Sequence, residues 1–364
     1  MNSWKRILPE ISNARRLRLH LVFSIAVIWT LIDLVNFFTS LPRSVGHSLF
    51  LNLIDDSLLL REGLVFGLSA VVGYILVFLL KKVLRNHSMW FALLTKSLIL
   101  VTAAVFISFL VHVSYSVASG KADLANAWSN FWYDALHSYW LVQKVTYWLA
   151  LLLITQVIIE VHDKYSPGVF FDILLGKYLK PKVEQRIVMF IDLKDSTPIA
   201  EKLGSVPYFK FIREFIYQIS IALIEHDGII YQYVGDEIVV SWYFNEQNTK
   251  KCMAALIEAR RNLQKRGEHF RRRYGILPEF RVGIHAGEVT VGEIGVIKKD
   301  LAMSGDTMNT TARIRTACSE LNQKFIVSRS FLDHIDLKEW QSESLGLVDL
   351  KGKNNSIELF ALKI

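Results

Sequence analysis

The sequence predicts a bundle of four membrane-spanning helices followed by a separate domain of mixed α and β structure. Apolar residues make up 52% of the 364 residues and charged residues only 21%, whereas soluble domains carry about 25% charge. The apolar surplus is concentrated in four long stretches within the first 160 residues. From about residue 186 onward, strand-like and helix-like periodicities alternate.

The four apolar stretches cover residues 17–38, 63–80, 91–113 and 139–159. Each approaches the roughly 20 residues that a helix needs to cross a ~30 Å hydrocarbon layer. The first stretch has no evident small-residue cleavage site, so we expect a retained anchor and not a signal peptide. Lysine and arginine are dense in residues 1–18 and 81–85 and sparse in the other two connections, which predicts that both termini are cytoplasmic.

Asp33, Lys96 and Lys144 are charged residues within the predicted spans. Asp33 and Lys144 lie at similar depths, and because isolated charges are costly in a bilayer we expect them to pair with each other. Lys96 lies near a cytoplasmic end, where its amine can reach the interface.

The outer connections contain an amphipathic stretch, residues 49–60, and an aromatic cluster between residues 128 and 140. Tryptophan and tyrosine are enriched at membrane interfaces, so an aromatic belt is expected. A sensor for lipid or for an unknown extracytoplasmic ligand is the alternative. His112 and His137 are potential haem or metal ligands, but no pattern of supporting polar residues accompanies them.

The predicted domains are a membrane domain (1–160), a helical linker (161–185) and a second domain (186–364). Pro167 and Gly168 should end the fourth helix, and residues 169–179 have the apolar spacing of a short amphipathic helix. About 180 residues are enough for the last domain to bury its own core.

The last domain is expected to be an α+β sandwich. Strands are predicted at 186–193, 229–234, 237–244, 280–286 and 288–296, and helices at 206–225, 250–274 and 306–319. Only Gly235 and Asp236 separate the second and third strands, which indicates a two-residue hairpin. This order favours a mostly antiparallel sheet with helices on one face.

Two aspartates are the first candidates for chemistry. Asp192 ends a buried strand and Asp236 lies at the hairpin tip, so both carboxylates project from one sheet edge if the hairpin pairs with that strand. With the Leu193 carbonyl they would suit hard divalent cations that also bind phosphate. By itself, however, an aspartate after an apolar run is more often a strand end, and Gly-Asp is more often a simple turn.

Four motifs that follow one another along the chain strengthen the interpretation of these aspartates as metal ligands. They are residues 190–197 (FIDLKDST), 234–237 (VGDE), 281–287 (RVGIHAG) and 305–313 (GDTMNTTAR). The series resembles the class III nucleotide cyclase catalytic domain, the adenylate/guanylate cyclase family, over residues 186–361. The whole chain resembles the membrane-anchored bacterial members. The resemblance implies a ferredoxin-like α+β fold that works as a head-to-tail homodimer, with active sites built from both chains.

By this resemblance, Asp192, Asp236 and the Leu193 carbonyl hold two Mg²⁺ or Mn²⁺ ions in each active site. Arg281 matches an arginine that contacts the nucleotide phosphates, and Lys351 matches a phosphate-binding lysine. A solvated turn at residues 351–353 is the alternative.

Asn309 and Arg313 are four residues apart and therefore share one helix face. The resemblance implies that both come from the partner chain, where Asn309 orients the ribose and Arg313 stabilises charge on the transferred phosphate. The implied reaction is attack of the ribose 3′-oxygen on the α-phosphate of a nucleoside triphosphate, and ATP is the substrate expected first. Its products are pyrophosphate and a 3′,5′-cyclic nucleotide.

The residues for base selection depart from the family pattern. Gln232 stands where adenylate cyclases have a lysine, and Ala302 where they have aspartate or threonine. Guanylate cyclases usually have glutamate and a small polar residue or cysteine at these places. Because glutamine both donates and accepts hydrogen bonds, adenine, guanine or a pyrimidine could be read.

The function predicted is that of a multi-pass cell-membrane cyclase in signal transduction, with a cytoplasmic catalytic domain. A guanylate or pyrimidine nucleotide cyclase is one alternative, and a non-catalytic cyclase-like membrane receptor is another. A diguanylate cyclase is disfavoured by the Asn-x-x-x-Arg helix, and a transporter by the lack of an inverted repeat. The net charge of +8 does not indicate nucleic acid, because much of it flanks the spans.

Overall fold

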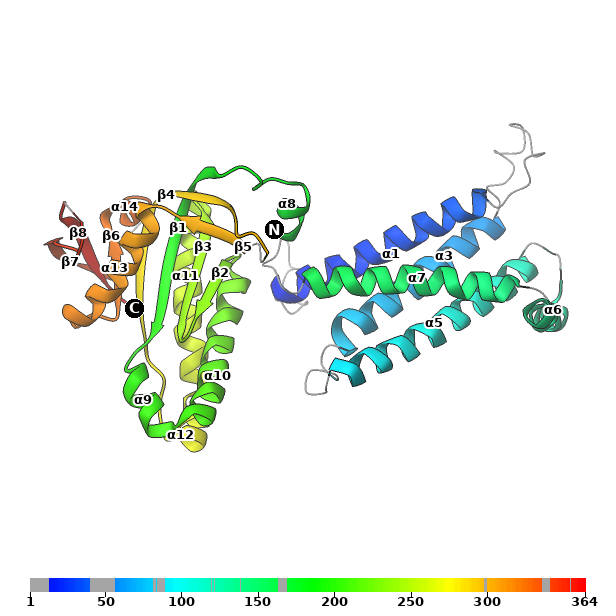
Figure 1. Ribbon diagram of the computed structural model, residues 1–364, viewed down its shortest axis with the longest axis horizontal. Coiled ribbons are helices and arrows are strands. Elements are labelled where there is room, and N and C mark those ends of the chain that lie inside the picture. The colour runs from blue at the N-terminus through cyan, green and yellow to red at the C-terminus, as the bar shows by residue number, and fades with distance from the viewer. Residues whose placement is uncertain are drawn as a thin grey trace, which may run out of the picture. The chain divides into compact units, whose positions relative to one another are not determined.

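The computed structural model describes residues 13–39, 56–80, 83, 89–118, 120, 122–137, 139–162, 169–297, 300–335, 341–353 and 355–364. The chain divides into two compact units. One unit, Arg15–Lys164, is built of helices, whereas the other, which includes Tyr165–Ile364, combines helices with a large sheet (Figure 1).

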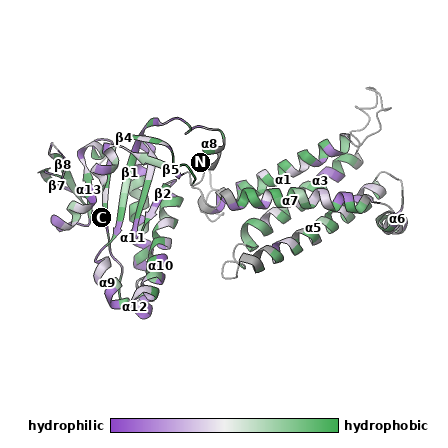
Figure 2. Cartoon of the chain, viewed as in Figure 1, coloured by the Kyte–Doolittle hydropathy of each residue, from purple (hydrophilic) through white to green (hydrophobic). Residues whose placement is uncertain are grey.

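The helical unit has four helices that are long and apolar enough to cross a membrane (Figure 2). The helices are α1 (Asn13–Thr39), α3 (Asp56–Tyr74) with its π-helical continuation η2 (Ile75–Leu80), α5 (Met89–Ala118) and α7 (Trp140–His162). A shorter helix, α6 (Leu124–His137), lies between α5 and α7 in the chain. The four apolar helices predicted from the sequence are therefore confirmed.

The direct partner of Asp33 in this unit is Arg61 and not Lys144, which corrects the prediction from sequence. Asp33 is 3% exposed and forms an ion pair with Arg61, which also pairs with Glu62. Helix α3 begins at Asp56, earlier than predicted, so Arg61 lies within the helix and close to Asp33. Lys144 still interacts electrostatically with Asp33.

The amine of Lys96 lies 3.3 Å from the Glu160 carboxylate, so this lysine also has an acidic partner. Elsewhere in the unit, Trp29 Nε1 donates a 2.8 Å hydrogen bond to Thr155 Oγ1 and thereby links α1 to α7. Helix α6 buries Phe131 but exposes Trp128 and Trp132, so an aromatic belt at an interface stays a prediction. Most of the predicted amphipathic stretch, up to residue 55, lies outside the described residues.

The second unit contains an eight-stranded sheet in its described residues, with the order β2-β3-β1-β4-β6-β8-β7 and with β5 paired to β4. Neighbouring strands are antiparallel except β4 and β6, which are parallel. The strands are β1 (Lys182–Leu193), β2 (Ile229–Val234), β3 (Glu237–Tyr243), β4 (Phe280–Ile294), β5 (Asp300–Ser304), β6 (Phe325–Ser328), β7 (Gln341–Val348) and β8 (Ile357–Lys363).

Helices cover both faces of this sheet. On one face, Ile187 and Met189 of β1 share a core with α10 (Ser205–Glu225) and α11 (Glu246–Lys265). On the other face, Val188 and Phe190 pack with Met308 of α13 (Asp306–Glu320). The expectation of helices on one face is therefore wrong. The unbroken apolar run of β1 already indicated burial on both sides, because a half-exposed strand would alternate.

Strand β4 is continuous, which corrects the prediction of two strands separated at Gly287. It pairs with β1 from Lys182↔Val291 to Leu193↔Phe280 without a turn. A Cβ on Gly287 would lie 2.6 Å from Thr307 Oγ1, and one on Gly283 would lie 2.5 Å from the Arg315 backbone nitrogen. The two glycines therefore do not mark a turn; they allow α13 to lie directly against β4.

Two predicted helices are shorter in the structure. The long basic helix divides into α11 and α12 (Gly267–Tyr274), where Gly267 packs tightly against Leu277. Helix α8 (Val169–Leu174) ends five residues early, because Gly176 adopts a left-handed conformation (φ 70°) and its N–H bonds to the Ile173 carbonyl. After this turn, Tyr178 Oη donates a 3.3 Å hydrogen bond to Glu184 of β1.

Substitution Gly283→Ala is expected to destabilise the sheet unit by about 1–3 kcal/mol, because the new methyl group meets two backbone atoms that cannot rotate away. Those atoms are the Arg315 nitrogen at 2.5 Å and the Thr311 carbonyl oxygen at 2.8 Å. The matched control is Gly287→Ala, whose methyl group meets a side-chain hydroxyl and should cost less. Thermal unfolding of both full-length variants in detergent tests this order, and equal or reversed losses would contradict it.

Candidate active site

Asp192 and Asp236 meet at one edge of the sheet. Asp192 is the penultimate residue of β1, and Asp236 lies in the β2–β3 turn, which needs the left-handed conformation of Gly235 (φ 62°). Because Ile191 pairs with Ile238, the turn lies beside the end of β1. Burial raises the pKa of Asp192 to about 6, and the Asp236 carboxylate adds to this rise while Arg315 opposes it.

The carboxylate pair supplies the oxygen ligands that a divalent cation prefers. Asp236 Oδ2 is buried and has no hydrogen-bond partner, an arrangement that is costly unless a cation or water satisfies the oxygen. The described residues contain no group of three His, Cys, Asp or Glu side chains arranged to hold a metal. The chain therefore offers two aspartates and the adjoining Leu193 carbonyl, a set that suits Mg²⁺ when phosphate and water complete its coordination.

Arg315 and Glu237 also belong to this cluster, although neither is among the site residues predicted from the sequence. Arg315 Nη1 lies 3.3 Å from Asp192 Oδ2, and its Nη2 lies 2.6 Å from Glu237 Oε2. The only sequence signal is that Arg315 adjoins the apolar face of α13, next to Ile314. An arginine placed there needs an acidic partner.

Asn309 and Arg313 are exposed on α13, whereas Thr311 and Ile314 of the same helix are buried. Within one chain, the described residues contain no ion pair between Arg313 and either aspartate. The structure thus brings Asp192 and Asp236 together and leaves Asn309 and Arg313 facing outward.

The predicted phosphate-binding residues lie on two different elements. Arg281 of β4 is directly opposite Asp192 of β1, and its side chain is partly buried. Lys351 is exposed in the turn before β8, where Gly352 has a φ of 79°. The neighbouring Lys353 pairs with Asp306, so this turn is tied to the start of α13.

The predicted base-selecting residues are far apart in the sheet order of one chain. Gln232 lies on β2 and is exposed, and Ala302 lies on β5 opposite Gly292 of β4. Strands β3, β1 and β4 lie between β2 and β5.

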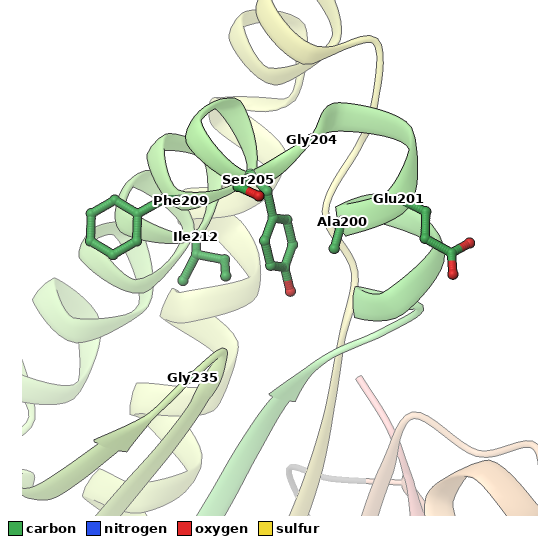
Figure 3. Close-up of a pocket in the computed structure, with 8 residues that line it drawn as sticks. Ala200, Glu201, Gly204, Ser205, Phe209, Ile212 and Gly235 are labelled. Carbon is green, nitrogen blue, oxygen red and sulfur yellow. The ribbon is translucent and has the colours of Figure 1, made fainter.

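A mostly apolar hollow of about 500 Å³ opens beside the hairpin tip (Figure 3). Phe209 and Ile212 of α10 line it together with Ala200 of α9 (Ser196–Leu203) and Gly235 of the turn. Tyr208 also lines it, and burial together with the Asp236 charge raises the pKa of this tyrosine. Of the residues that line this hollow, Gly235 alone belongs to a motif identified in the sequence.

Comparison with known proteins decides the family. The protein-family model of the adenylate and guanylate cyclase catalytic domain matches residues 179–363, half of the chain. The chain belongs to this family. It is a class III cyclase, as the motifs predict.

This cyclase is 28% identical over 270 residues to adenylate cyclase 2 of Rhizobium meliloti (strain 1021), covering 74% of each chain. It is 24% identical over 216 residues to an adenylate cyclase of Anabaena cylindrica, covering 55% of this chain but 42% of that protein. A solved bacterial light-regulated adenylyl cyclase has a TM-score of 0.52 at 17% identity, covering 60% of this chain and 64% of that one. That likeness confirms the predicted cyclase fold.

The cyclase keeps one histidine of its motifs in an uncharged state. His285 of β4 is partly buried, and its Nδ1 lies 2.7 Å from Ser328 Oγ. Burial lowers the pKa of His285 to about 4, and the nearby Lys353 charge lowers it further than the Asp306 charge raises it.

His285 should therefore make the free energy of unfolding depend on pH. Its pKa is about 4 when folded and about 6.5 when unfolded, so the unfolded chain binds the proton first. The contribution of His285 to the free energy of unfolding is therefore greatest above pH 6.5. It decreases as the pH falls towards 4, by up to about 1.4 kcal/mol per pH unit.

Thermal unfolding of the wild type and His285→Asn between pH 8 and 4 measures this effect. The wild type should lose more stability on acidification than the variant, which lacks the titrating group. Parallel curves would contradict the assignment.

Proposed function

We propose that the protein is a membrane-bound adenylate cyclase that converts ATP to 3′,5′-cyclic AMP and pyrophosphate at sites shared by two chains. The observation that carries the proposal is the pair of adjoining carboxylates with a buried, unsatisfied oxygen on Asp236. Within this family, such a pair has a direct use in binding cations that accompany a triphosphate.

Asp192, Asp236 and the Leu193 carbonyl would hold two Mg²⁺ or Mn²⁺ ions. When bound, such ions neutralise phosphate charge and lower the pKa of an attacking hydroxyl. Arg281, beside Asp192 in the sheet, would bind phosphate oxygens, and Lys351 would add a further positive charge to the same group. The apolar hollow that contains Phe209 and Ile212 is suited to the uncharged faces of a nucleoside.

Asn309 and Arg313 would act on the substrate bound to the partner chain. Both are exposed on α13, as residues that cross a dimer interface must be before the dimer forms. Asn309 would orient the ribose so that its 3′-oxygen faces the α-phosphorus. As that oxygen attacks, the bond from the α-phosphorus to the oxygen of the leaving pyrophosphate breaks, the 3′-proton passes to solvent, and Arg313 stabilises the developing charge.

Gln232 and Ala302 would read the base. With glutamine and alanine at these positions, the pocket has fewer fixed hydrogen-bonding requirements than one built from lysine and aspartate. ATP is favoured because the relatives described above are adenylate cyclases. GTP or a pyrimidine nucleotide is the alternative that the same residues admit.

The four apolar helices would anchor the protein in the cell membrane, with both termini and the catalytic domain in the cytoplasm, as the distribution of lysine and arginine indicates. The proposed organisation is a membrane domain (1–160), a linker (161–185) and a catalytic domain (186–364). Because each active site needs both chains, a signal received by the bundle would act by changing how two catalytic domains meet.

The purified full-length protein should convert ATP to cyclic AMP in the presence of Mn²⁺ or Mg²⁺. We would incubate it separately with ATP, GTP, CTP and UTP and identify the products by mass spectrometry. Asp192→Ala is the control and should lower turnover at least about 100-fold, because a cation ligand is lost. Cyclic GMP or a cyclic pyrimidine nucleotide would reassign the base, and no product from any nucleotide would favour a non-catalytic receptor.

Two inactive variants should restore activity when they are co-expressed. Asp192→Ala lacks a cation ligand and Arg313→Ala lacks the residue proposed to act in the partner's site. A heterodimer of the two has one intact site, so random pairing should give about a quarter of the wild-type activity. Activity assays on the co-purified chains, with each variant alone as control, test the shared site; no recovery would contradict it.

A further inference from the structure

Arg315 places a positive charge within the carboxylate cluster of its own chain. Its Nη1 lies 3.3 Å from Asp192 Oδ2 and its Nη2 lies 2.6 Å from Glu237 Oε2. The side chains of Arg315, Asp192 and Glu237 are only 28%, 20% and 15% exposed. Because water and salt screen such partly buried charges weakly, the guanidinium strongly affects any other cation that approaches the cluster.

The packing of α13 against β4 fixes the position of the Arg315 backbone, from which the guanidinium extends. The Arg315 backbone nitrogen would lie 2.5 Å from a Cβ on Gly283, so the helix touches β4 at this residue. Three residues further along the helix, Cys318 Sγ donates a 3.3 Å hydrogen bond to the Val282 carbonyl. With its backbone held at both points, Arg315 cannot leave the cluster through a movement of the helix alone.

The cluster still has more negative than positive charge. Asp192, Asp236 and Glu237 supply three carboxylates, whereas Arg315 supplies one guanidinium. Asp236 Oδ2 is buried without a hydrogen-bond partner, and in the described part of the chain no ion pair reaches Asp236. Arg315 therefore offsets the repulsion among the carboxylates only in part and leaves an acceptor for a further cation.

We propose that Arg315 is a built-in counter-ion that competes with a divalent cation for Asp192 and so sets the affinity of the site. The inference rests on the proposed function, because it takes Asp192 and Asp236 as the cation ligands. With Arg315 present, the carboxylates stay together without metal, but an entering cation meets a like charge and a partly neutralised ligand. Without Arg315, the same carboxylates bind the cation more tightly and repel one another more when it is absent.

Mn²⁺ binding to the full-length protein in detergent, without nucleotide, tests the inference by titration calorimetry or by the electron paramagnetic resonance of free Mn²⁺. Arg315→Gln should bind Mn²⁺ at least about tenfold more tightly than the wild type. Arg315→Lys keeps the charge and should stay within about threefold of the wild type. Arg272→Gln removes one positive charge from an exposed ion pair on α12 and should leave Mn²⁺ binding unchanged.

Thermal unfolding supplies a second readout that does not depend on activity. Without metal, Arg315→Gln should unfold at a lower temperature than the wild type, because three carboxylates then repel one another. Saturating Mn²⁺ should raise its unfolding temperature by more than it raises that of the wild type, since tighter binding to the folded state gives greater stabilisation.

The outcomes separate this inference from the proposed function. If Asp192→Asn abolishes Mn²⁺ binding while Arg315→Gln binds it no more tightly than the wild type, the counter-ion role is overturned and the metal site stands. If Asp192→Asn leaves Mn²⁺ binding unchanged, the proposed metal site is overturned and the counter-ion role falls with it. Tighter binding in Arg315→Gln together with its loss in Asp192→Asn supports both.

Discussion

Helix α13 lies so close to β4 that a Cβ on Gly283 would come within 2.5 Å of the Arg315 nitrogen. This contact requires glycine at a position in the middle of a strand, where any other residue would hold the helix away. It brings one face of α13 against the sheet and directs Arg315 towards Asp192, while Asn309 and Arg313 remain exposed. Helix α13 thus directs Arg315 into the carboxylate cluster and leaves Asn309 and Arg313 exposed on its outer side. Both placements depend on the lack of a side chain at Gly283.

Buried charge is handled in three different ways in this protein. Asp33 in the helical unit is 3% exposed and is paired directly with Arg61, as expected for a buried carboxylate. His285 carries no charge near neutral pH and needs no acidic partner, because burial lowers its pKa to about 4. The carboxylates around Asp236 are only partly compensated by Arg315, and a buried oxygen remains without a partner. Such incomplete compensation is costly in a structural ion pair but useful in a site that receives a cation.

Much of the architecture could be predicted from local patterns, and the failures have physical causes. The four apolar stretches and the β2–β3 hairpin were predictable because hydropathy and turn residues act over short distances. Strand β4 was not, because Gly287 signals a turn when read along the chain but serves here to admit Thr307 of α13. The pairing of Asp33 with Arg61 was missed for a related reason, because it depended on where α3 begins.

The sequence by itself determined the family, the four helices long and apolar enough to cross a membrane, and the identity of Asp192 and Asp236 as candidate ligands, since order, spacing and hydropathy carry that information. Only the tertiary structure showed that the two aspartates adjoin, that Glu237 and Arg315 belong to the same cluster, and that an apolar hollow lies beside it. Arg315 follows Asp192 by more than a hundred residues, and no local pattern links them. Their contact results from the sheet register and the packing of α13, which are properties of the whole fold.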